Sequence, residues 1–369
     1  MSQFDLFGAA HATPAPTGAT DATDARSEVI AAAVGASAPG TPPRRRGDVL
    51  PAPADTALQT LAGTLPAGLH LGTSSWSFPG WRGIVWDDDY PETRLARQGL
   101  GAYASHPLLR CVGIDRSFYA PLTLTDYQRY ASQVPAHFRF VVKAPSLVCD
   151  ATVRNDKGQG VSANPCFLDA ALAADKFVTP CLLGLGNKAG VLVFQFSPLP
   201  PEWLGSAHGF VERLGEFLAA LPPLPRSSPG AGPCYAVEIR DATLLTPRFI
   251  KTLRQAGVRY CLGLHARMPS VARQAAALAL LDEQAGGPLV VRWSLNSAYR
   301  YEQAKAKYAP FDKLIDPDPD TRRVLATLAA HYARAGQPVY LVVNNKAEGS
   351  SPLSCLKLAE AIADTATTS

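Results

Sequence analysis

The sequence predicts an α/β fold, a single (β/α)8 barrel of the TIM type preceded by a disordered N-terminal tail. Eight short apolar runs alternate with helical patterns after residue 68. Most of these runs lack strict polar alternation, which is typical of strands covered on both faces. Eight such strands interleaved with helices indicate a parallel sheet that closes on itself.

The first 67 residues differ in composition from the rest of the chain. They are rich in Ala, Thr, Pro and Gly and contain the basic run Arg44–Arg46. Such a segment has little apolar surface to bury, so we expect a disordered tail over residues 1–67 and one barrel domain over residues 68–369. The Pro- and Ser-rich stretch Pro222–Pro233 is interpreted as an insertion between two elements.

The expected strands are rich in Val, Leu, Phe and Tyr. They are Leu69–Ser75, Arg110–Arg116, Phe138–Ala144, Gly190–Phe196, Cys234–Ile239, Val258–Leu264, Leu289–Leu295 and Pro338–Asn344. The expected helices are Glu92–Ala104, Phe167–Phe177, His208–Ala220, Pro247–Ala256, Val271–Gln284, Thr321–Ala335 and Pro352–Ala363. An open, doubly wound sheet is the alternative, but no G-x-G-x-x-G follows the first strand, which disfavours a dinucleotide-binding version of it.

Composition restricts the classes of partner. A net charge of +4 with 18% charged residues requires neither a membrane nor direct, sequence-specific binding to nucleic acid. Seven cysteines form no C-x-x-C pair, which favours reduced thiols in a cytoplasmic protein over a zinc site or a disulfide framework. No apolar run is long enough to span a bilayer, and the N-terminus does not resemble a secretion signal. No metal or other cofactor is assigned.

Large ionisable side chains fall at the expected carboxyl ends of the strands, where a barrel of this type builds its active site. We expect Lys143, Glu238, Arg240, His265, Arg292 and Asn344 to line one cavity there. Its excess of cations suits a small anionic ligand such as a phosphate or carboxylate. The alternative interpretation is a set of structural salt bridges.

Two residues are the catalytic candidates. Glu238 is the best general acid or base, unless it serves only to pair with Arg240 or Lys143. Lys143 could form a Schiff base if desolvated, but an anion-binding role is favoured. The substrate-binding candidates are Trp76, Asp115, Tyr119, Gln195, Arg240, His265, Arg292, Asn344 and Asn345. For the aromatic side chains packing at the barrel top is the alternative, and for the Asn pair it is a turn.

Six segments at these strand ends occur in the same order as in a known family. They are Gly72–Phe78 followed by Trp81, Val112–Tyr119, Phe138–Ala144, Phe194–Pro198, Ala236–Arg240 and Val343–Gly349. Through them the chain resembles the YecE-like proteins, the domain-of-unknown-function 72 family, over nearly everything after residue 68. The resemblance implies a TIM-type barrel distantly similar to sugar isomerases, and it implies no established reaction.

Two positions depart from the family pattern. Gly113 stands where the family has an acidic residue on the second strand, and Ser294 stands where its seventh-strand segment usually has a histidine. A lost carboxylate and a lost imidazole fit either a lost or altered catalytic function or a subfamily with another ligand.

A short motif lies outside the expected barrel. Gln3-Phe4-Asp5-Leu6-Phe7 resembles the pentapeptide with which bacterial replication and repair proteins bind the sliding clamp. Leu6 and Phe7 would be the apolar anchors and Gln3 a hydrogen-bonding group. The alternatives are a chance apolar cluster and a strand that caps the bottom of the barrel. Three functions are therefore open: an enzyme with isomerase- or hydrolase-like activity, a factor recruited to the clamp, and a non-catalytic ligand-binding barrel.

Overall fold

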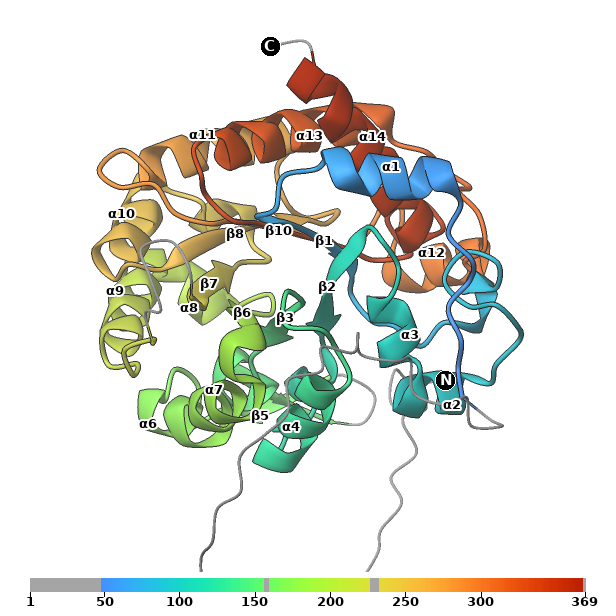
Figure 1. Ribbon diagram of the computed structural model, residues 1–369. Helices are drawn as coiled ribbons and strands as arrows, with labels where there is room; N and C mark the ends of the chain where they lie inside the picture. Colours follow the sequence, from blue (N-terminus) through green and yellow to red (C-terminus); the bar gives the residue numbers. More distant parts are fainter. Residues whose placement is uncertain (1–47, 156–158, 226–231, 368–369) are drawn as a thin grey trace, which may run out of the picture.

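Eight parallel strands close into one barrel, which confirms the fold class expected from the sequence (Figure 1). This computed structural model describes residues 48–155, 159–225 and 232–367. Successive barrel strands are neighbours, and the last pairs with the first. The strands are β1 (Leu69–Thr73), β2 (Leu109–Ile114), β3 (Arg139–Lys143), β6 (Ala189–Gln195), β7 (Cys234–Glu238), β8 (Arg259–Leu264), β9 (Leu289–Trp293) and β10 (Val339–Val343).

Helices surround the strands on the outside (Figure 1). The longer ones are α1 (Thr56–Thr64), α2 (Glu92–Gln98), α4 (Leu124–Ser132), α7 (Thr179–Leu185), α9 (Ala207–Ala219), α10 (Pro247–Gln255), α11 (Val271–Leu281), α12 (Tyr301–Tyr308), α13 (Pro319–Arg334) and α14 (Ser351–Thr367). Shorter ones are α3 (Leu100–Ala104), α5 (Ser146–Cys149), α6 (Ala170–Ala173) and α8 (Pro201–Gly205). Within the described ranges, no helix combines the length and the apolar character needed to cross a bilayer.

The expected boundary of the tail at residue 67 is wrong for residues 48–67, which pack on the barrel. Helix α1 lies beside α14 (Figure 1), and Asp55 caps its N-terminus by accepting a hydrogen bond from the backbone of Leu58. Ala62 and Leu65 are buried in the main core. The apolar positions of this segment recur at helical spacing within an Ala- and Thr-rich composition, so composition alone hid them. Residues 1–47, including the pentapeptide Gln3–Phe7, lie outside the described residues.

The helical run after β3 is longer than expected. It continues from α6 through a π-helical turn, Ala174–Val178, into α7, rather than ending at Phe177. Pro180, at the start of α7, lacks the N–H that a regular helix would use, and such sites favour a wider turn. Helix α4 was not expected from the sequence, although Thr123 and Asp126 form its capping box. Helix α12 and the antiparallel hairpin of β4 (Thr152–Arg154) with β5 (Gly160–Ala163) were not expected either.

The barrel interior is packed mostly with small and branched side chains. Alternate residues of the strands contribute Cys111, Val141, Val191, Val193, Ala236, Cys261, Val290, Tyr340 and Val342, which form a cluster separate from the main core. Side chains two positions further along a strand point the same way. The residues that follow this cluster towards the carboxyl ends therefore face the barrel mouth.

Candidate functional site

Each barrel strand ends with a polar side chain at the mouth. These side chains are Ser74, Asp115, Lys143, Gln195, Glu238, His265, Arg292 and Asn344. They do not share one cavity. Most of the expected site residues gather in or beside an ion-pair network over β6, β7 and β9, whereas Trp76, Tyr119 and Asn344 line a cavity over β1, β2 and β10.

Arg292 is the centre of the network. Its guanidinium donates to Oε2 of Glu238 at 2.6 Å and to both carboxylate oxygens of Asp115 at 2.8 Å. It also donates to the amide oxygen of Gln195 at 3.2 Å. Because these partners come from β7, β6 and the end of β2, one planar donor group on β9 ties together four strands. Arg292 is only 5% exposed, so these contacts are shielded from water.

Arg240 completes the pairing of Glu238. Its Nη2 lies 2.6 Å from Oε1 of Glu238 and donates to Gln195 at 2.9 Å. Burial alone would raise the pKa of the Glu238 carboxyl, but the two arginines outweigh it and hold that pKa below its ordinary value. A fully buried, ionised and doubly paired carboxylate is poorly suited to act as a general acid. The geometry therefore supports the ion-pair interpretation of Glu238.

A glycine on the neighbouring strand leaves room for this carboxylate. A Cβ added to Gly263 on β8 would lie 3.2 Å from Oε1 and 3.3 Å from Cγ of Glu238. These contacts are tighter than ordinary packing, so a larger side chain would require Glu238 to shift by a few tenths of an ångström. The glycine is thus part of what positions the network.

Lys143 and His265 lie beside the network. Nζ of Lys143 lies 3.5 Å from the ring centroid of Phe118 and has no ion-pair partner within the described residues. Burial, together with the positive charges of Arg292 and Arg240, lowers the pKa of Lys143 to about 7, against the opposing effect of Asp115. Burial and Arg240 lower the pKa of His265 to about 4, so this imidazole is neutral at pH 7.

A cavity of about 500 Å³ opens at the other half of the mouth. Its walls come from the loop after β1, the end of β2, helices α2, α4 and α12, and the end of β10. Of the expected ligand-binding residues, Trp76, Asp115, Tyr119 and Asn344 line it. Asp115 belongs to both halves, because Arg292 holds its carboxylate from the network side.

The cavity contains a lysine that sequence analysis missed. Lys346 is 5% exposed, and its Nζ lies 4.3 Å from the ring centroid of Tyr301 and 6.0 Å from that of Phe311. In the part of the chain that the structure describes, Nζ has neither an ion-pair nor a hydrogen-bond partner. Burial, reinforced by the charge of Lys305, lowers the pKa of Lys346 to about 8. Lys346 is thus a buried cation without an anion.

Aromatic rings form much of the wall around Lys346. Trp76 is 7% exposed and packs edge-on against Tyr130 with ring centroids 5.3 Å apart. Tyr119 is half exposed at the rim. Flat rings of this kind offer contact area to the apolar face of a small ligand.

The two asparagines after β10 serve different purposes. Asn344 lines the cavity, donates from Nδ2 to Oγ of Ser74 at 2.7 Å and accepts the backbone N–H of Lys346 at 3.0 Å. Asn345 points elsewhere, where its Oδ1 accepts the backbone N–H and hydroxyl of Ser351, the first residue of α14. This contact supports a structural role for Asn345 rather than the expected contact with a ligand.

The described residues include no group of three or more His, Cys, Asp or Glu side chains that could hold a metal ion. Glu238 and Asp115 do converge, but on the guanidinium of Arg292.

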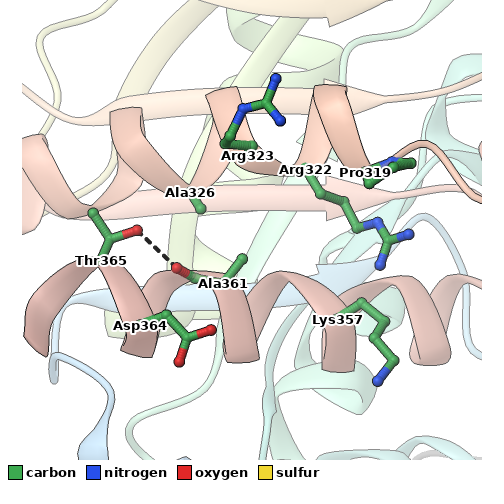
Figure 2. Close-up of a pocket in the computed structure, with 8 residues that line it drawn as sticks. All are labelled: Pro319, Arg322, Arg323, Ala326, Lys357, Ala361, Asp364 and Thr365. Atoms are coloured by element: carbon green, nitrogen blue, oxygen red, sulfur yellow. Dashed lines mark hydrogen bonds between the residues drawn. The ribbon is translucent and has the colours of Figure 1, made fainter. Parts of the chain in front are cut away.

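A second hollow, of about 450 Å³, lies outside the barrel between α13 and α14 (Figure 2). Its cations already have partners: Arg322 pairs with Glu348, Arg323 with Asp320 and Lys357 with Glu360. Figure 2 shows Arg323 and Lys357 pointing away from each other, so they do not converge on one ligand position. We therefore place the candidate site at the barrel mouth.

Comparison with known proteins agrees with this architecture. No curated protein matches the chain. A DUF72 family protein from Enterococcus faecalis shares 16% identity, with a TM-score of 0.51 over 80% of this chain and 95% of its own. A DUF72 family protein from Thermotoga maritima shares 14% identity, with a TM-score of 0.50 over 81% of this chain and 99% of its own. At these identities the likeness shows the fold alone.

The family itself is shown by a match of sequence. The family model described as "Protein of unknown function DUF72" matches residues 70–369, which is most of the chain and nearly all of the barrel. This match confirms the resemblance carried by the strand-end segments. The chain belongs to the DUF72 family.

Proposed function

We propose that this protein binds a small anionic metabolite, phosphorylated or sugar-like, in the cavity over β1, β2 and β10. The observation that carries the proposal is Lys346, a buried cation in the cavity wall without a paired anion among the described residues. A buried charge is expensive unless it is paired, so an anionic group of a ligand would stabilise it.

The charges around the cavity support an anionic ligand. Lys305 and Arg116 line it together with Lys346. Of the two acidic side chains in the wall, Asp115 is already held by Arg292, which leaves Glu92 to oppose three cations. Aromatic walls beside this charge fit a ligand with one ionised end and one less polar face, as in a sugar phosphate or a small carboxylic acid.

A screen for bound metabolites tests the proposal. Small molecules released from the purified protein are identified by mass spectrometry, for the wild type and for Lys346→Met and Lys357→Met. The second variant removes an exposed lysine on α14 and serves as the matched control. We expect an anionic compound with the wild type and the control and its loss from Lys346→Met. Equal recovery from all three proteins would contradict the proposal.

Catalysis at this site is a separate question. An isomerase- or hydrolase-like reaction needs a group that exchanges protons with the ligand. Asp115 is the carboxylate of the cavity wall that touches the network, whereas Glu238 lies outside the cavity lining. Turnover of the recovered metabolite by the purified protein would favour an enzyme, and binding without turnover would favour a ligand-binding barrel in the cytoplasm.

The sequence supports a second candidate function, recruitment to the sliding clamp through Gln3, Leu6 and Phe7. The path of the first described residues is compatible with it. Leu50 and Ala52 bond to the backbone of Asp87 and Val85, which follow β1 on the side of the barrel mouth.

The test is a titration of labelled residues 1–12 with purified clamp. We expect a dissociation constant on the order of micromolar. The Leu6→Ala/Phe7→Ala peptide is the control. Equal binding of both peptides, or no binding at tens of micromolar, would contradict recruitment.

A further inference from the structure

We propose that Lys346 is an amine nucleophile that forms a Schiff base with a small aldehyde or ketone carrying a carboxylate or phosphate group. The inference rests on the proposed function, because the same cavity must first bind the anionic part of the ligand. It adds the reactive part of that ligand, a carbonyl group, and the covalent bond that Lys346 would make to it.

The surroundings of Lys346 favour the neutral amine, which is the nucleophilic form. The side chain is 5% exposed and its Nζ lies against the rings of Tyr301 and Phe311. No carboxylate of the described chain lies within ion-pair distance of Nζ. A lysine desolvated among apolar side chains, with another cation nearby, is the setting in which protein amines become nucleophiles.

The second cation is Lys305, which lines the same cavity on α12. Its charge adds to the burial that lowers the pKa of Lys346 to about 8, while Asp115 and Glu302 oppose the shift. At pH 7 roughly a tenth of Lys346 would be neutral, against less than about a thousandth of an exposed lysine. While protonated, Lys346 pairs with an anion that has no carbonyl group, such as sulfate. When its neutral amine attacks a carbonyl carbon, Lys305 and Arg116, which line the same cavity, hold the anionic group of the ligand.

Lys143 is the competing lysine within the barrel. Its pKa is also lowered, to about 7, but it does not line the cavity, and its Nζ is directed at the face of Phe118. A cavity of about 500 Å³ gives a small ligand room next to Lys346. Access, rather than basicity, therefore distinguishes the two amines.

The step needs no oxidant or reductant. The lone pair of Nζ attacks the carbonyl carbon, a C–N bond forms, and the electrons of the C=O π bond move to the oxygen, which takes up a proton. Nζ then loses one proton to give the carbinolamine. The hydroxyl takes up a second proton and leaves as water while the nitrogen lone pair forms the C=N bond, and Nζ releases its second proton to leave the neutral imine. One carbonyl compound and one amine thus give one imine and one water.

Reductive trapping tests the inference on the full-length protein. Glyoxylate, an aldehyde with a carboxylate, is added with cyanoborohydride, which supplies hydride to any C=N bond, and the modified lysines are mapped by mass spectrometry. We expect Lys346 to be labelled at least ten times faster than the exposed Lys357. The labelling rate should rise with pH up to about pH 8 as the neutral amine of Lys346 forms. Uncharged glycolaldehyde should label Lys346 more slowly.

Two variants separate this inference from the proposed function. Lys346→Arg keeps the positive charge but cannot form the imine, so it should still bind sulfate and lose the adduct at position 346. Lys357→Arg is the matched control and should be labelled at Lys346 like the wild type. If the wild type binds sulfate but the label is spread evenly over exposed lysines, or is concentrated on Lys143, the Schiff base at Lys346 is wrong and anion binding stands. If the wild type shows neither sulfate binding nor the adduct, both proposals are wrong. If a variant fails to fold, the position of the label on the wild type still tests the Schiff base.

Discussion

The two halves of the barrel mouth contain similar charged side chains in opposite states of pairing. Over β6, β7 and β9, Arg240 and Arg292 are bound by Glu238, Asp115 and Gln195 at hydrogen-bonding distance. Over β1, β2 and β10, Lys346 is buried to a similar degree but lies against aromatic rings.

This difference separates structural charge from available charge. In the paired half the charges of Arg240, Arg292 and Glu238 are neutralised within the chain, so a ligand binding to them would have to displace an existing partner. In the other half no carboxylate offsets the free-energy cost of burying the Lys346 amine, so a bound anion would stabilise that charge. Burial alone therefore does not identify the site, and the state of pairing does.

The largest expected effect comes from breaking the paired half. Glu238→Gln leaves Arg292 and Arg240 buried without their shared carboxylate, and we expect a loss of about 3–5 kcal/mol in the free energy of unfolding. Urea denaturation measures it. Glu283→Gln removes an exposed partner of Arg254 and should change stability by less than about 1 kcal/mol. Similar values for the two variants would show that the network is not structural.

Acid should weaken the same half. The pKa of Glu238 is held below its ordinary value in the folded state, so its contribution to stability is complete above the unfolded pKa of about 4.3. That contribution is lost as pH falls through the lower folded pKa. Between pH 6 and pH 3 the free energy of unfolding, measured by urea denaturation, should therefore fall more steeply for the wild type than for Glu238→Gln. Parallel curves of unfolding free energy against pH would contradict the pairing of Glu238 with the arginines.

Removing the unpaired charge of Lys346 should raise the free energy of unfolding instead of lowering it. Lys346→Met replaces a buried amine by an apolar side chain of similar length. We expect the free energy of unfolding to increase by about 1–3 kcal/mol at pH 7. Because burial lowers the pKa of Lys346 to about 8, the unfolded chain binds more protons between about pH 8 and pH 10.4. Wild-type stability rises over that range, so the gain should shrink towards pH 10. Lys357→Met is the control, and a destabilised Lys346→Met would contradict the account.

The glycine at position 113 gives a smaller test of the cavity wall. A Cβ there would lie 3.0 Å from the carbonyl oxygen of Ser74, so the carboxylate that the family pattern has at this position would crowd the end of β1. We expect Gly113→Ala to lower the free energy of unfolding by about 1–2 kcal/mol. Gly63→Ala, on α1 with no atom near the new Cβ, should be neutral or stabilise by up to about 1 kcal/mol. Thermal unfolding of both variants checks this difference.

Sequence patterns predicted the barrel better than the site. Each expected strand overlaps a barrel strand, and the ends agree to within two residues. Such agreement is possible because apolar runs bounded by turns report burial directly. Helix α12 was missed because, of its side chains, Ala304 and Tyr308 are the buried ones and leave no clear apolar stripe.

The cavity was missed for a related reason. Alternation along a strand predicted that Glu238 and Arg240 would share a neighbourhood, and they do. Lys346 lies in a loop, and the rings beside it come from α12 and the segment after it. No local pattern links a loop lysine to aromatic residues about forty positions earlier. Whether a strand-end cation is paired is a property of the assembled barrel mouth.

The affinity for sulfate as a function of pH tests the central claim most directly, because sulfate keeps its charge between pH 6 and pH 10. If Lys346 is the unpaired cation of the site, wild-type affinity should be flat below about pH 8 and fall on the order of tenfold per pH unit above it. Lys346→Arg should bind sulfate with no such fall. Wild-type affinity that is constant up to pH 10, or that falls equally in Lys346→Arg, would contradict the assignment of Lys346 as the anion-binding group.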